Sequence, residues 1–72
     1  MTTEEMYFAV FCIESLAEHL SLNGAEVYAK LSADSDLLDK YIVQHYDTLH
    51  TQGKAYIVND IVEIMQKEGL LQ

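Results

Sequence analysis

No proline interrupts this 72-residue chain, and its glycines are limited to Gly24, Gly53 and Gly69. Proline and glycine are the residues that most strongly break regular backbone structure. Their scarcity leaves little room for long irregular connections in so short a chain. Alternation of polar and apolar residues with a period of two is nearly absent, so no strand is predicted. We therefore expect an all-α fold, a compact bundle of four short helices that forms a single domain over residues 1–72.

Capping patterns predict where the helices begin. Thr2 with Glu5, and Asn23 with Glu26, have the form of a capping box, in which each side chain satisfies an otherwise unpaired backbone amide. Apolar residues recur at helical spacing after both pairs. Gly69 is a typical left-handed helix end. The expected helices span residues 2–20, about 24–32, 37 to between 49 and 53, and 53 or 54 to 69.

The first predicted helix is apolar on all sides over its first two turns, where Tyr7, Phe8, Phe11 and Cys12 lie close together. A helix of this kind is usually buried, so we expect it at the centre of the fold or in a contact between copies of the chain. The wide apolar face of the last helix adds to this, and a homodimer or homo-oligomeric structural domain is one candidate role. Cys12 is expected to be a core residue and not a nucleophile, because burial raises the pKa of a thiol.

The charge of the chain is strongly acidic. Twelve acidic residues stand against four lysines and no arginine, which gives a formal net charge of −8. Phosphate backbones are repelled by such a surface, and arginine is the usual reader of phosphate and guanine, so we expect no nucleic-acid partner. An acidic surface attracts basic protein partners instead.

Two features bear on location. Cys12 is the only cysteine, which fits a reducing compartment. The run of apolar residues at positions 6–13 is far shorter than the roughly 20 residues that a membrane span needs. The sequence therefore predicts a soluble cytoplasmic protein with no membrane partner.

Polar residues are densest between His45 and Ile61, and this segment contains His45, Asp47 and His50. One alternative is a small metal-binding protein or enzyme that uses these three residues. On a continuous helix, positions 45 and 50 lie about 140° apart, so the two rings would not reach one metal ion. No HExxH or cysteine-pair motif is present. We therefore expect no cofactor, no metal ligand and no catalytic residue, with histidines that satisfy backbone carbonyls near a helix end.

The turn at Thr51, Gln52 and Gly53 has two interpretations. The first amides of the following helix can cradle an anion. Alternatively, Thr51 caps that helix and Gly53 supplies a backbone turn, which is the commoner use of these residues and the one we favour. Five tyrosines against two phenylalanines are also notable, because tyrosine is common at interfaces. We expect two or three of them at the core edge and the remainder free to contact a partner.

Three segments carry a resemblance to a known family: FCIE at residues 11–14, NGAEVY at 23–28 and YDTLHTQGKAYIVNDI at 46–61. Together they resemble a family of short bacterial proteins described only as a domain of unknown function, and the likeness spans nearly the whole chain. Members are often encoded beside a protein similar to ADP-ribosyltransferases, which implies an accessory, inhibitor or antitoxin-like role. The candidate partner-binding or junction residues are Tyr46, His50, Thr51, Gln52, Gly53, Tyr56 and Asp60.

The function that these observations favour is a non-catalytic protein–protein interaction module. Its expected partner is a basic protein or the product of a neighbouring gene. Substitution of His50 by alanine is expected to disturb the stability of the junction or a protein contact, and not a chemical step.

Overall fold

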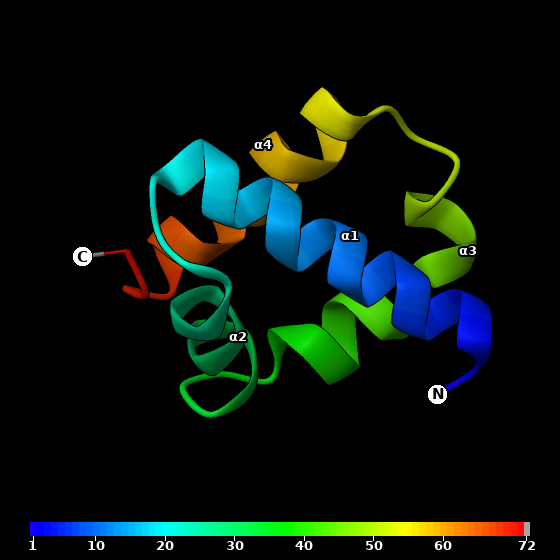
Figure 1. Ribbon diagram of the computed structural model, residues 1–72, viewed down its shortest axis with the longest axis horizontal. Helices are drawn as coiled ribbons and strands as arrows, with labels where there is room; N and C mark the ends of the chain where they lie inside the picture. The colour runs from blue at the N-terminus through cyan, green and yellow to red at the C-terminus, as the bar shows by residue number, and fades with distance from the viewer. Residues whose placement is uncertain (72) are drawn as a thin grey trace.

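The structure is a computed structural model that describes residues 1–71, and every regular element in that range is helical (Figure 1). The all-α fold class is therefore confirmed. No helix in this part of the chain is both long enough and apolar enough to cross a bilayer. The elements are α1 (Thr3–Leu20), α2 (Gly24–Ser32), the π-helical turn η1 (Leu38–Val43), α3 (Tyr46–Leu49) and α4 (Lys54–Lys67).

Helix α1 is the central element, and it packs against α2, η1 and α4 (Figure 1). Its inner side supplies Cys12 and Leu16, both fully buried, to one core cluster that also contains Leu31, Ile42 and Ile61. The central position predicted for this helix is thus confirmed. Within one copy of the chain, however, the outer side of the first turns of α1 is exposed to solvent, and a contact between copies on that side stays a prediction.

Both predicted capping boxes are present. The Glu5 amide donates to Thr2 Oγ1 at 3.1 Å, and the Thr2 amide donates to Glu5 Oε1 at 2.8 Å. Asn23 and Glu26 make the same reciprocal pair, with distances of 2.8 and 3.1 Å. Between them, Ser21 adopts a left-handed conformation with φ 58°, which ends α1 and turns the chain toward α2.

The third predicted helix is divided in two, so this part of the chain differs from the continuous α-helix expected. Residues Leu38–Val43 form a π-helical turn, and α-helical structure resumes only at Tyr46–Leu49. In an α-helix, Leu37 and Ile42 would lie about 140° apart. A π turn is closed by bonds between residues five apart, which brings such positions to the same side. Both residues are buried in the core, with exposed fractions of 6% and 0%.

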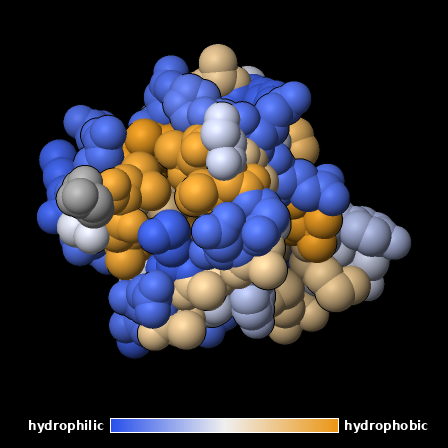
Figure 2. All heavy atoms as spheres, turned by 60° about the vertical axis from the view of Figure 1, so that its left-hand side comes forward, coloured by the Kyte–Doolittle hydropathy of each residue, from blue (hydrophilic) through white to orange (hydrophobic). Residues whose placement is uncertain are grey.

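The end of α4 agrees with the sequence. Gly69 has φ 75°, and the Leu70 amide donates to the Met65 carbonyl at 2.9 Å, so the chain turns back on the last helical turn. Lys30 on α2 donates from Nζ to the Leu70 carbonyl at 2.9 Å, which ties this turn to α2. Leu70 and Leu71 pack against the core but are only partly buried. On the side near the C-terminus, Figure 2 shows hydrophobic atoms at the surface within a border of hydrophilic ones.

Candidate functional site

The segment from His45 to Ile61 forms α3, the following turn and the first half of α4. The structure does not gather its seven predicted residues into one site. Tyr46 contacts Phe8 in the first half of α1, and His50 stacks on Tyr46, so both residues lie on the side of the junction that faces α1. Gln52 and Tyr56 line a hollow on the side of Tyr41. Tyr41 also bonds Asp60, so the junction has two distinct faces.

The first face is an aromatic stack. The rings of Tyr46 and His50 are nearly parallel, with centroids 4.3 Å apart, and Phe8 meets Tyr46 edge-on at 5.5 Å. His50 Nδ1 lies 2.7 Å from the Tyr46 carbonyl oxygen, which can only accept, so the imidazole donates this hydrogen bond. The expectation that a histidine satisfies a backbone carbonyl near a helix end is confirmed for His50.

The second face is built around Tyr41, which is not among the site residues predicted from the sequence. Its hydroxyl donates to the Asp60 carboxylate, and its ring lies 5.2 Å from that of His45, centroid to centroid. Burial, together with the hydrogen bond and negative charge of Asp60 and the proximity of Tyr56, raises the pKa of Tyr41 to about 12. The only local signal for this cluster is the spacing of four residues between Tyr41 and His45.

Two shallow hollows flank Tyr56 on this second face. One, of about 270 Å³, is also lined by Tyr41, His45 and Gln52. The other, of about 310 Å³, is lined by Tyr56, Asn59, Asp60 and Glu63. Tyr56 itself is 56% exposed, so its ring is available to a partner.

Thr51 and Gly53 have different roles from those predicted. The Thr51 hydroxyl donates to the Thr48 carbonyl at 2.8 Å, so it closes the end of α3 and does not cap α4. The N-cap of α4 is Gly53, which lies two residues later and offers no side-chain hydrogen bond. Gly53 has φ −73° and ψ 161°, an extended conformation open to any residue, and a Cβ added there would meet nothing within 4 Å beyond its chain neighbours. Glycine is therefore not required at this turn.

The three residues of the metal-binding alternative are not brought together. His45 lies beside Tyr41, whereas His50 lies on Tyr46. Within residues 1–71, no three histidine, cysteine, aspartate or glutamate residues are grouped so as to hold a metal ion. Cys12 is fully buried, and burial raises its pKa to about 12, as expected of a core thiol.

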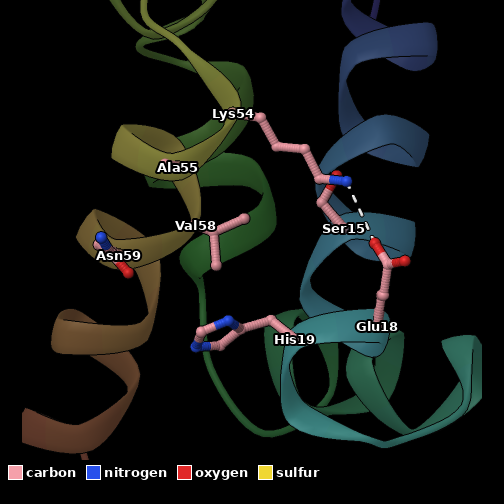
Figure 3. A pocket seen from close by; sticks show the side chains of 7 residues that line it. All are labelled: Ser15, Glu18, His19, Lys54, Ala55, Val58 and Asn59. Carbon is pink, nitrogen blue, oxygen red and sulfur yellow. Dashed lines mark hydrogen bonds and ion pairs between the residues drawn. The ribbon is translucent and has the colours of Figure 1, made fainter.

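A further hollow lies between α1 and α4 (Figure 3), and no pattern in the sequence indicated it. Its volume is about 540 Å³. Lys54 at the start of α4 donates from Nζ to Glu18 Oε1 on α1 at 3.1 Å, and this ion pair spans the rim. The residues that line the hollow are Ser15, Glu18, His19, Lys54, Ala55, Val58 and Asn59.

Comparison with known proteins gives one match. No curated protein and no solved structure is significantly similar to the chain. One family matches residues 7–68, a range that includes α2, η1, α3, α4 and most of α1. This agrees with the resemblance noted in the sequence to a family of unknown function. The chain belongs to the family described as "Protein of unknown function (DUF3791)".

Proposed function

We propose that this protein is a non-catalytic protein-interaction module whose partner presents a basic surface. The observation that carries this proposal is the outer side of α1, where Met6, Tyr7, Val10 and Phe11 are 50%, 69%, 46% and 39% exposed. Spacings of three and four residues place side chains next to one another on a helix, so these four form one patch. A contiguous apolar patch of this kind is a feature of protein interaction sites, whereas single exposed apolar residues are ordinary.

The charge of the chain favours a basic partner. Three of its four lysines already lie against oxygen atoms of the chain: Lys30 against the Leu70 carbonyl, Lys54 against Glu18, and Lys67 against Glu63 at 4.0 Å. These lysines offset few of the twelve acidic residues, and the formal net charge is −8. Electrostatic complementarity of this kind speeds association and selects among partners.

The state of the nucleophilic and basic side chains supports a role without chemistry. The Cys12 thiol is buried, and its raised pKa keeps it protonated near neutral pH. The His50 ring is stacked on Tyr46 and bonded to a carbonyl, which is a structural arrangement. The accessory, inhibitor or antitoxin-like role implied by the family resemblance is one form of such a module.

The test is affinity purification of the tagged chain, at its native expression level, from the organism that encodes it. We expect a basic protein, with the product of a neighbouring gene as the first candidate, to bind the purified chain in calorimetry and to change its own activity on binding. Affinity should fall as salt concentration rises, since the attraction is between opposite charges. A candidate that fails to bind, and whose activity is unaffected, would overturn the proposal for that protein. The absence of any specific partner would overturn the proposal altogether.

Self-association is the competing role for the same patch. Light scattering distinguishes the two, because the isolated chain has a mass of 8.2 kDa. We expect that mass, since each copy carries a formal net charge of −8 and two copies repel one another. A stable dimer at micromolar concentration would favour the homo-oligomeric role.

A further inference from the structure

The exposed patch on α1 continues into the groove between α1 and α4. Phe11, at the end of the patch, lines a hollow of about 240 Å³ together with Glu14, Ser15, Glu18 and Lys54. Ser15, Glu18 and Lys54 also line the 540 Å³ hollow of Figure 3. The two hollows therefore adjoin along the Glu18–Lys54 ion pair, and they extend the apolar patch toward α4.

The walls of this groove have the composition of an interface pocket. Val58 and Ala55 on α4 supply apolar surface, and Figure 3 shows Val58 and His19 directed into the space between the two helices. Val58 and Ser15 are each only 5% exposed, so the bottom of the groove is fixed by the core. An apolar centre with a polar rim is typical of protein interfaces.

The rim of the groove is acidic on its α1 side. Glu14 and Glu18 are exposed, and Glu18 is paired with Lys54 through side chains that are 77% and 55% exposed. Exposed ion pairs contribute little to stability, so an incoming cation can replace Lys54 at small cost. Arginine suits this exchange because its guanidinium pairs with a carboxylate in a bidentate manner. A second copy of the chain, with a formal net charge of −8, is the wrong complement for this rim.

We infer that the groove between α1 and α4, together with the outer side of α1, receives a cationic amphipathic helix from the partner. Its apolar side chains would fill the groove, and its arginines would pair with Glu14 and Glu18. Residues 1–71 contain no sheet edge on which a partner could add a strand, whereas an apolar groove between two helices is the kind of surface that binds the apolar side of an amphipathic helix. This inference rests on the proposed function and identifies both the docking surface and the chemistry of the partner.

The test uses a designed peptide probe and can be carried out before the native partner is identified. A helical peptide of about 18 residues carries leucines at helical spacing on one side, with arginines beside them, as helix-in-groove recognition requires. A control peptide has glutamate in place of each arginine. Both are titrated into the isotope-labelled chain and followed by NMR. We expect shifts concentrated on the outer side of α1 and on the groove residues, with the arginine peptide bound at least tenfold more tightly.

Two exposed carboxylates provide a matched pair of variants. Glu18 and Glu63 each pair with a lysine, but only Glu18 lines the groove. Glu18→Gln should lower the affinity for the arginine peptide at least threefold, whereas Glu63→Gln should lower it less than twofold. Ala55→Arg, at an exposed position of the groove wall, should abolish binding by filling the groove with a cation.

Several outcomes would overturn the inference. In the NMR titration, these outcomes are chemical-shift changes confined to the face around Tyr41 and Tyr56, equal affinity for the two peptides, or no saturable binding. A dimer of the chain that dissociates on the substitution Ala55→Arg would also overturn it. If a native partner binds Glu18→Gln and Ala55→Arg as tightly as the unaltered chain, the groove is not the docking surface, although the proposed function as an interaction module still holds. The lack of any native partner would instead remove the module.

Discussion

The hydroxyl of Tyr41 donates a hydrogen bond to the carboxylate of Asp60, and this contact links η1 to α4 across nineteen residues of sequence. The neutral phenol is favoured by burial and by the negative charge beside it, which raises the pKa of Tyr41 from 10 to about 12. The contact should therefore weaken in the pH range where the Tyr41 hydroxyl ionises.

We predict that the free energy of unfolding falls as the pH rises from 10 to 12. In that range the unfolded chain releases the Tyr41 proton while the folded chain retains it, so the stability present below pH 10 is lost on approach to pH 12. Tyr41→Phe cannot titrate and should show a shallower fall. At pH 7 it should lose about 1 kcal/mol with the hydrogen bond. Urea unfolding at pH 7, 10 and 11.5 measures both effects, and parallel pH profiles for the two proteins would contradict the assignment.

Cys12 should be unreactive in the folded chain. Its side chain has no exposed surface, and its pKa of about 12 leaves almost no thiolate at pH 8. A thiol reagent should therefore react slowly with the native protein and rapidly in denaturing urea. Cys12→Ser should cost about 1–3 kcal/mol, because it buries a hydroxyl in an apolar core. Rapid native modification would show that α1 opens without global unfolding.

Gly53 and Gly69 should respond in opposite directions to substitution. Gly53 precedes α4 in an extended conformation with open space around it, so Gly53→Ser adds a capping oxygen and should stabilise the protein by a few tenths of a kcal/mol. Gly69 has φ 75°, a left-handed conformation that is unfavourable for alanine, so Gly69→Ala should destabilise the protein by about 1 kcal/mol. Thermal unfolding of both variants provides the comparison. Destabilisation of similar size in the two would show that Gly53 has a role its backbone does not reveal.

His50→Ala should loosen the end of α3 without affecting partner affinity. The substitution removes a ring stacked on Tyr46 at 4.3 Å and a hydrogen bond to the Tyr46 carbonyl. We expect a loss of about 0.5–1 kcal/mol, at the lower end for aromatic pairs since the site is exposed. His50→Phe retains the stacking and should recover part of the loss. A tenfold drop in partner affinity with unchanged stability would place the docking surface at this junction instead of the groove.

The parts of the fold that could be predicted from the sequence are those determined by neighbours in the chain. The capping boxes of Thr2 and Asn23, and the left-handed turn at Gly69, each depend on residues within about five positions. The π-helical turn was not predicted, because it depends on how Leu37 and Ile42 pack against the rest of the core. Periodicity alone cannot indicate that packing.

The candidate site was predicted less well for the same reason. Helical spacing predicted that the rings of His45 and His50 point apart, and the fold does place them on different faces. Their spacing did not indicate that His45 would lie beside Tyr41 or that Tyr41 would bond Asp60. The groove between α1 and α4 depends on Glu18 and Lys54, which are thirty-six residues apart. No local pattern connects such a pair. Thr51 was assigned to the wrong helix because its hydroxyl bonds backward in the chain, to Thr48.

The central position of α1 has a consequence during synthesis. Of the described helices, α1 is made first, whereas α4, which closes its inner side, is made last. At roughly 5–20 residues per second, the ribosome needs about 2–10 seconds to pass from the end of α1 to the end of α4. Throughout that interval the core cluster that buries Cys12 and Leu16 in the finished fold lacks its members from α4, which are Ile57, Val58, Ile61 and Met65. During this time α1 has an apolar side on its inner face as well as on its outer one. Because like charges repel, we expect the carboxylates of Glu4, Glu5, Glu14 and Glu18 on this helix to oppose its association with other copies of the nascent chain.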